Sequence, residues 1–149
     1  MNIGNQFKRI LAATDGSQAA ERAVVFAAGL AASCGAELVV LTVDDEVASR
    51  ELQVFGRIEH VVTSELLESQ HAAIFVNARA LAAGAGAANV TTMSETGDPA
   101  TQILDAARKI DANLIVTGRR GCGRLEGLIL GSVSQKLASL APCLLLIVP

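Results

Sequence analysis

Short runs of apolar residues recur along the chain, and the longer segments between them carry apolar residues at every third or fourth position. The short runs are bounded by glycine or polar residues, as strands usually are. The second, fourth and fifth runs are almost continuously apolar, which is typical of parallel strands covered on both faces. The pattern predicts strands over residues 8–13, 38–43, 90–94, 114–117 and 144–148.

The longer segments have the periodicity of helices that bury one face. They predict helices over residues 17–34 and 57–83, and two more that begin at Asp98 and Ser132. In the second helix the positions expected to face the core are Ile58, Val62, Leu66, Ala73, Val76, Ala80 and Ala83. In the third and fourth helices they are Ile103, Ala107, Ile110, Val133, Leu137 and Leu140.

Start and stop signals support these helices. Ser17 and Asp98 are favoured N-cap residues, and Pro99 suits the first helical position. Gly35 is expected to end the first helix, because glycine readily adopts the left-handed conformation found at helix ends. Ser132 is expected to cap the last helix.

The alternation of strands and helices indicates an α/β fold. Right-handed crossovers then give an open, five-stranded parallel sheet with helices on both faces, a Rossmann-like arrangement. The chain has 149 residues, 51% of them hydrophobic, which suits a single domain over residues 1–149. In the segment 23–43 only Glu37 is charged, but Gly35 divides the segment into a helix and a strand, so no membrane span is expected.

Composition narrows the classes of function. The net charge is −3, and the chain has no Trp, no Tyr and four Phe. Binding of nucleic acid is not expected, because it relies on basic surfaces and aromatic stacking. Any nucleobase held by this protein has to lie against aliphatic side chains. Cys34, Cys122 and Cys143 lack redox or zinc spacing, and no secretory signal is present, so reduced thiols in a cytoplasmic protein are expected.

Two loops that follow predicted strands carry candidate chemistry. Doubly wound sheets bind ligands beyond the carboxyl ends of their strands. The first strand ends in the sequence ATDGS (13–17), and the fourth ends in TGRRG (117–121), from which a glycine-rich loop reaches Gly131 and Ser132. Glycine amides and a helix N-terminus together favour phosphate binding. The loop is neither a Walker A motif nor the dinucleotide fingerprint, which require other spacings.

The spacing Gly118-x2-Gly121-x9-Gly131-Ser132 resembles the ATP-binding signature of the universal stress protein family. The first-strand Asp15 and the segments LTVD (41–44), DANLIV (111–116) and APCLLLIVP (141–149) are also similar to that family, so the resemblance covers essentially the whole chain.

The resemblance implies an adenine nucleotide alpha hydrolase-like fold that binds ATP, or AMP or ADP, with Mg²⁺ or Mn²⁺ held mainly by the phosphates. It places adenine against Val43, and the ribose or phosphates near Asp15. The nucleotide-binding residues it implies are Ala13, Thr14, Asp15, Val43, Thr117, Gly118, Arg120, Gly121, Gly131, Ser132 and Val133, with the amides of the glycine loop and of Ser132 and Val133 receiving the phosphates. It also implies a homodimer that pairs through the last strand, Leu144–Val148.

Several other polar residues have ordinary interpretations. His60 and His71 lie about 16 Å apart along one predicted helix and are expected on its solvated face, too far apart to share a metal. Candidate nucleophiles or phosphorylation sites are Ser17, Ser132 and Ser134, but neither histidine is expected near them, and capping is the favoured role of Ser17 and Ser132. The acidic residues 44–46 are either a cation site or the solvated end of a strand. Cys122 lies within the phosphate loop and is either a passive small residue or a redox-sensitive one.

The favoured function is an ATP-binding regulatory protein of the stress response whose dimer or partner contacts depend on the bound nucleotide. No catalytic residue and no dedicated metal ligand set are predicted. One alternative is a slow ATPase or phosphotransferase in which Asp15 orients a water and the arginines stabilise charge. The others are a nucleotide-free protein-interaction member of the same fold, and an FMN-binding flavodoxin-like protein, for which flanking aromatic residues are lacking.

Overall fold

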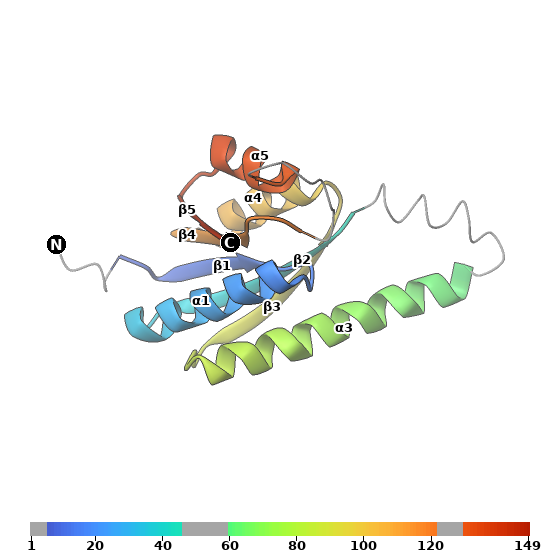
Figure 1. The fold of residues 1–149 in the computed structure, drawn as a ribbon, viewed down its shortest axis with the longest axis horizontal. Coiled ribbons are helices and arrows are strands. Elements are labelled where there is room, and N and C mark those ends of the chain that lie inside the picture. Colours follow the sequence, from blue (N-terminus) through green and yellow to red (C-terminus); the bar gives the residue numbers. More distant parts are fainter. Residues whose placement is uncertain (1–5, 46–59, 122–129) are drawn as a thin grey trace.

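Five parallel strands form one sheet in the order β3-β2-β1-β4-β5. The structure is a computed structural model that describes residues 6–45, 60–121 and 130–149, without the side chains of residues 60–67. The strands are β1 (Arg9–Ala13), β2 (Glu37–Asp44), β3 (Val90–Thr96), β4 (Leu114–Gly118) and β5 (Leu144–Val148). The helices of the described part are α1 (Gln18–Cys34), α3 (His60–Gly84), α4 (Pro99–Lys109) and α5 (Ser132–Leu140). The predicted fold class is confirmed (Figure 1).

Helices cover both faces of the sheet. Figure 1 shows α1 and α3 on one side and α4 and α5 on the other. Alternate residues of each strand point to opposite faces of the sheet. In β1, Ile10 and Ala12 pack toward α1, whereas Leu11 and Ala13 pack toward α4 and α5. Each layer therefore has its own buried apolar cluster. Within the described residues, no helix has both the length and the apolar composition needed to cross a bilayer.

The strand order reverses beside β1. The chain runs outward from β1 to β2 and β3, and then returns to β4 on the other side of β1. Both neighbours are parallel to β1, with Ala12 level with Val40 of β2 and Val116 of β4. After β1 the chain enters α1 on one face, and after β4 it goes on to α5 on the other. The chain therefore leaves the carboxyl ends of β1 and β4 toward opposite faces of the sheet. A crevice remains at these two strand ends, as in other doubly wound sheets.

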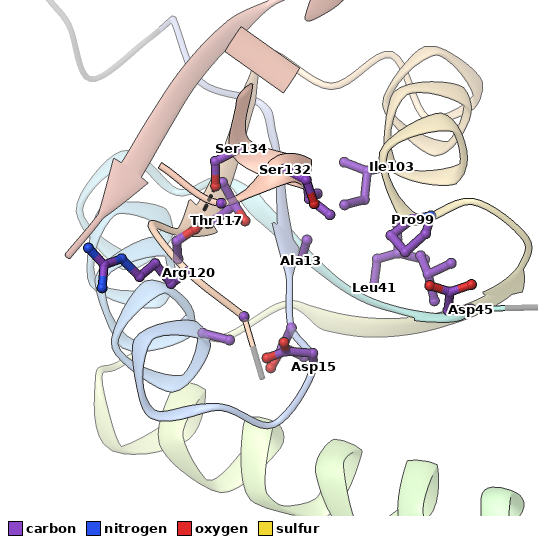
Figure 2. Close-up of a pocket in the computed structure, with 17 residues that line it drawn as sticks. Ala13, Asp15, Leu41, Asp45, Pro99, Ile103, Thr117, Arg120, Ser132 and Ser134 are labelled. Atoms are coloured by element: carbon purple, nitrogen blue, oxygen red, sulfur yellow. Dashed lines mark hydrogen bonds between the residues drawn. The ribbon is translucent and has the colours of Figure 1, made fainter. Parts of the chain in front are cut away.

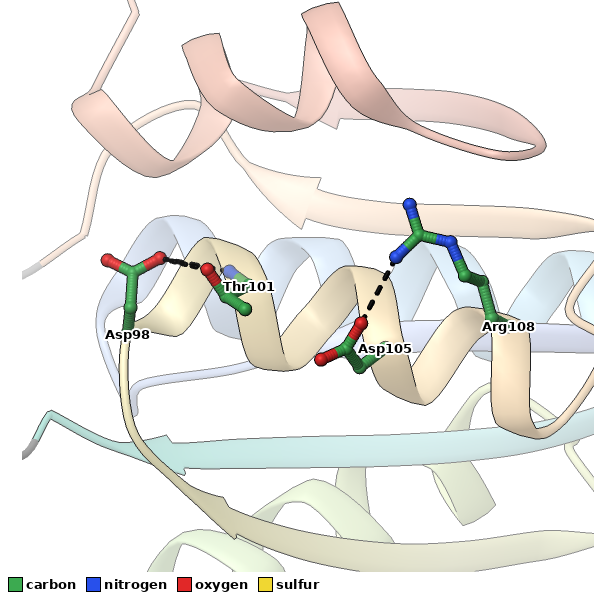
Figure 3. Close-up of polar contacts among 4 residues, drawn as sticks. All are labelled: Asp98, Thr101, Asp105 and Arg108. Carbon is green, nitrogen blue, oxygen red and sulfur yellow. Dashed lines mark hydrogen bonds and ion pairs between the residues drawn. The ribbon is translucent and has the colours of Figure 1, made fainter.

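Local signals fixed the ends of the first and third predicted helices correctly. The Ser17 side chain accepts a hydrogen bond from the Ala20 amide, and Gly35 ends α1 at a φ of +67°. Asp98 caps α4, because its carboxylate accepts from the amide of Thr101 at 3.0 Å and from its hydroxyl at 2.7 Å (Figure 3). These three predictions are confirmed.

The predicted buried face of α3 is wrong. Val76 is 70% exposed, and Ala73, Ala80 and Ala83 are exposed with it. The helix instead buries Ala78 and Ala82, flanked by the half-buried Ile74 and Leu81. Alanines occur on every side of this helix, so its periodicity does not single out one face. The packing of the helix against α1 and the sheet determines which face is buried. Ile58 and the side chains of Val62 and Leu66 lie outside the described residues.

The third and fourth predicted helices bury the expected positions with one exception. Ile103, Ala107 and Leu137 are buried, and Ile110 and Val133 pack partly buried against the same cluster. Leu140 is 59% exposed, contrary to the prediction. Leu140 is the last residue of α5, and the next residue, Ala141, packs against the buried cluster instead.

Replacing Asp98 by Ala should destabilise the protein by about 1 kcal/mol, because the first turn of α4 loses its cap. Hydrogen bonds from Thr101, aided by Lys136, lower the pKa of Asp98 from its ordinary value of 3.8. The ionised carboxylate is thus favoured by folding, and its contribution should be complete above pH 4 and disappear as the pH falls through the lowered pKa. Urea unfolding at neutral and acidic pH measures this.

Asp98→Asn is the matched control, because asparagine also caps helices well but does not titrate. It should keep most of the stability at neutral pH. A loss in Asp98→Ala that stays constant on acidification would contradict the role of the ionised cap.

Candidate functional site

A cavity of about 560 Å³ opens at the carboxyl ends of β1, β2 and β4, beside the N-termini of α4 and α5 (Figure 2). All eleven residues predicted to bind nucleotide line it, so the structure brings the whole predicted set together. The lining residues that the prediction omitted are Ala20, Leu41, Asp45, Pro99, Ile103 and Ser134. Leu41 could have been found from strand alternation, because it lies two positions before Val43 on the same face of β2.

The turn after β1 is held by hydrogen bonds to β2 and to itself. The Thr14 amide donates to the carbonyl of Leu41 at 2.9 Å, and the Thr42 hydroxyl donates to the carbonyl of Thr14 at 3.2 Å. Asp15 accepts a hydrogen bond from the Ser17 amide through Oδ1, at 2.9 Å. These bonds fix the Asp15 carboxylate at the mouth of the cavity, beside the glycine loop.

Two glycines let the loop after β4 approach its neighbours closely. A Cβ on Gly118 would lie 2.9 Å from the backbone carbon of Ala19, where α1 begins. A Cβ on Gly121 would lie 2.5 Å from Asp15 Oδ2. Real Cβ atoms do not come this close to other heavy atoms, so something must shift in each case. At Gly118 the neighbour is the backbone of α1, so the packing requires glycine, whereas at Gly121 the Asp15 carboxylate can swing aside and only its contact with the loop is lost.

Ser134 holds the end of β4 against α5. Its buried hydroxyl, 2% exposed, lies 3.0 Å from the carbonyl oxygen of Gly118 and 3.3 Å from that of Arg119, and donates toward both. The Gly131 amide donates to the same Arg119 carbonyl at 3.0 Å. Ser134 therefore positions the loop, and its hydroxyl is not arranged as a nucleophile. The Gly131 amide, expected to face a phosphate, is engaged within the protein.

The N-terminus of α5 presents amides at the cavity. The capping residue is Gly131, which offers no side-chain hydrogen bond, so the expected cap at Ser132 is wrong and Ser132 is the first helical residue. The first backbone bond of the helix runs from the Gln135 amide to the Gly131 carbonyl. The amides of residues 132–134 precede it and have no partner inside the helix. A helix end of this kind, with its positive dipole, suits an anion.

The rest of the cavity is aliphatic. Leu41, Val43 and Ile103 contribute branched side chains, and no aromatic side chain is among the lining residues of the described chain. Asp15 and Asp45 add carboxylates, and in Figure 2 the Arg120 side chain extends away from Ala13 at the cavity centre. The cavity thus has an amide-rich end at α5 and an apolar end between β2 and α4. Cys122 and Arg124 lie outside the described residues.

His71 does not lie on a solvated face as predicted. Its Nε2 is 2.7 Å from Asp44 Oδ1, and its side chain is only 16% exposed. Its Nδ1 is 3.4 Å from the Ser94 hydroxyl. The helix α3 packs beside the ends of β2 and β3, and this encloses the imidazole. The side chain of His60 lies outside the described residues.

Asp44 and Asp45 of the acidic segment 44–46 do not face the same place, and Glu46 lies outside the described residues. Asp44 turns toward α3 and His71, whereas Asp45 lines the cavity. Within residues 6–45, 60–121 and 130–149, no three His, Cys, Asp or Glu side chains are grouped to hold a metal ion. Cys34 and Cys143 are free, and burial raises the pKa of the Cys143 thiol against a smaller opposite effect of a backbone hydrogen bond with Ile115.

An open parallel sheet with a cavity where the strand order reverses places the protein among the ligand-binding, doubly wound α/β proteins. The chain belongs to the universal stress protein family, whose sequence profile matches residues 6–149. It is 34% identical over 147 residues to universal stress protein YxiE of Bacillus subtilis, an alignment that covers 95% of this chain and 99% of the relative.

Solved structures share the fold. Universal stress protein UspA from Lactobacillus plantarum superimposes with a TM-score of 0.79 at 27% identity, covering 97% of this chain and 99% of the other. A universal stress protein in complex with cAMP gives a TM-score of 0.71 at 26% identity, covering 96% of this chain and 97% of the other.

Gly118→Ala should destabilise the protein by about 1–3 kcal/mol, because the added methyl group meets the backbone of α1 and neither element can move freely. Gly29→Ala in α1 is the control, because a Cβ there meets no atom within 4 Å and the helix should not lose stability. Thermal unfolding compares the two. Equal midpoints would contradict the close approach of β4 to α1.

Proposed function

We propose that the protein binds an adenine nucleotide in this cavity, as one domain over residues 1–149, and acts as a cytoplasmic regulatory protein in the stress response. The observation that carries the proposal is a cavity in which a helix N-terminus without a side-chain cap and the glycines of the β4–α5 loop adjoin an aliphatic slot. The related structure described as a complex with cAMP supports an adenine ligand for this fold.

The two ends of the cavity orient the nucleotide. The phosphates lie at the first turn of α5, where the amides of Ser132 and Val133 donate to them. The ribose lies near Ala13, Asp15 and Thr117, at the ends of β1 and β4. The base then fills the apolar end against Leu41, Val43 and Ile103, since an aliphatic surface favours burial of a flat, weakly polar ring.

ATP is the proposed ligand, with AMP and ADP as alternatives, and Mg²⁺ or Mn²⁺ accompanies the phosphates. The residues present fit this arrangement, because Asp15 places carboxylate oxygens in the cavity beside Gly121, between the proposed positions of the ribose and the phosphates, and hard cations take oxygen ligands. The metal supplies charge neutralisation there. The protein contributes one carboxylate, so most of the ligands come from the phosphates and water.

A regulatory role is favoured over catalysis by the side chains at the phosphate end. The buried Ser134 hydroxyl donates to backbone carbonyls, and His71 lies on the other side of β2 from the cavity. No described residue of the lining is thus paired as nucleophile and base. Binding rather than turnover is the proposed output.

The nucleotide loop is bonded directly to the edge of the sheet. The Arg119 amide donates to the Val148 carbonyl at 2.7 Å, and the Arg119 carbonyl accepts from the start of α5. The strand β5 is an edge strand, and its Leu144 is 61% exposed. We propose that two copies pair through β5, residues Leu144–Val148, and that a bound nucleotide alters this contact through Arg119.

ATP with Mg²⁺ should raise the thermal unfolding midpoint by several degrees at 100 times its Kd, which corresponds to about 2.7 kcal/mol. Gly131→Val should abolish this shift, because the branched side chain would obstruct the path of the phosphates to the first turn of α5. Gly29→Ala is the control, as a Cβ there meets no atom within 4 Å and the position is on α1, away from the cavity.

Two results would contradict the site. One is a wild-type protein that shows no shift with ATP, ADP, AMP or FMN at millimolar concentration. The other is a Gly131→Val protein that retains the wild-type affinity. A shift with FMN alone would favour a flavodoxin-like function instead.

Leu144→Lys should weaken the dimer with little effect on the stability of the fold, because the side chain is exposed and a charge there opposes pairing of two edge strands. Sedimentation velocity over a concentration series measures this. Leu146→Lys is unsuitable, since Leu146 packs against the core shared with α1. A sedimentation profile unchanged by Leu144→Lys would place the interface elsewhere.

A further inference from the structure

Two consecutive aspartates at the end of β2 face opposite sides of the sheet. Val43 packs toward α4 and α5, and Asp44 points the other way, to His71 of α3 at 2.7 Å. Asp45 returns to the side of Val43 and lines the cavity. This alternation follows from the extended backbone, in which neighbouring side chains point to opposite faces. Only Asp45 of the pair can therefore meet a ligand in the cavity.

Asp45 stands at the apolar end of the cavity. In Figure 2 its carboxylate lies on the same side of the cavity as Pro99 and Leu41, which line the cavity with it, and on the side opposite Arg120. The residue is half-buried. A carboxylate beside aliphatic side chains is a strong and directional hydrogen-bond acceptor, and a bound base that covers it would exclude the water that competes for it. It has two oxygens, so one can serve a ligand while the other keeps a protein partner.

We propose that Asp45 determines the base specificity of the cavity by accepting a hydrogen bond from the exocyclic amine of adenine. This inference rests on the proposed function and on the orientation of the nucleotide given there. The aliphatic side chains that flank the base cannot distinguish one purine from another, because every purine offers them similar surface. A polar group at the end of the slot supplies the distinction.

The chemistry of the acceptor explains which base is selected. An ionised carboxylate only accepts hydrogen bonds. Adenine presents an N–H donor at the amine, hypoxanthine presents a carbonyl oxygen there with its N1–H donor beside it, and unsubstituted purine presents no polar group at that position. The amine of adenine satisfies Asp45, the carbonyl oxygen of hypoxanthine opposes it unless the base shifts to present N1–H, and purine leaves the carboxylate without its bond to the ligand.

The same carboxylate also opposes reversed binding. A nucleotide turned end to end would place its phosphates beside Asp45 and its base at the amides of α5. Like charges at the first position and unused donors at the second both disfavour that orientation. Asp45 therefore contributes to orientation as well as to the choice of base.

The test is a double-mutant cycle between the protein and the ligand. Isothermal titration with Mg²⁺ compares ATP with purine riboside 5′-triphosphate, which lacks only the exocyclic amine. The proteins are the wild type, Asp45→Ala, Asp45→Asn and Asp105→Ala. Asp105 is an exposed residue of α4 paired with Arg108 at 3.1 Å (Figure 3), so its variant removes one negative charge without touching the cavity.

The wild type and Asp105→Ala should both bind ATP about tenfold or more tightly than the purine analogue. Asp45→Ala should lose most of this preference, mainly by weaker binding of ATP. Asp45→Asn should keep part of it, because the amide oxygen still accepts a hydrogen bond and the side chain has the same shape. This conservative variant also keeps the test valid if Asp45→Ala unfolds.

Equal loss of affinity for both ligands in the two Asp45 variants would overturn the proposal, because Asp45 would then contact another part of the nucleotide. A wild type that binds ATP and the analogue equally would also overturn it while leaving nucleotide binding intact. A wild type that binds neither ligand would overturn the proposed function and this inference together.

Discussion

The carbonyl groups of Gly118 and Arg119 are the point on which the site depends. The Ser134 hydroxyl donates toward both carbonyls, and the Gly131 amide donates to that of Arg119. These hydrogen bonds hold the end of β4 against the first turn of α5. The Arg119 amide extends the same network to Val148 of β5. One short stretch of backbone thus joins the cavity, a helix N-terminus and the sheet edge, and none of its bonds requires a charged side chain.

The cavity itself follows from the order of the strands. Because β1 lies between β2 and β4, the helices after β1 and β4 depart on opposite faces and the strand ends cannot be covered. The sequence then gives the two sides of this opening different chemistry. The start of α5 supplies amide donors on one side, and the alternating residues of β2, with Pro99 and Ile103 of α4, supply apolar surface on the other.

Features set by local chemistry were predictable from the sequence, and features set by packing between distant segments were not. The caps at Ser17 and Asp98 depend on a few neighbouring residues, and the glycine spacing located the cavity. The buried face of α3 depends on which side of the helix meets α1. Because alanines occur on every side of this helix, its sequence is compatible with more than one buried face. His71 and Ser134 owe their environments to residues far away in the sequence, Asp44 and Gly118, so no local pattern indicates their roles.

The two edges of the sheet differ in a way that limits how copies of the chain can assemble. β5 presents leucines, isoleucine and valine, whereas β3 at the opposite edge presents exposed Thr91, Ser94 and Thr96. Edge-to-edge addition at β5 uses the same surface on both copies, so a two-fold axis closes the contact. The exposed polar residues of β3 then give a third copy of the chain no apolar edge with which to pair. The proposed pairing through β5 would therefore end at two copies, whereas a sheet with two apolar edges could add further copies and extend into a fibre.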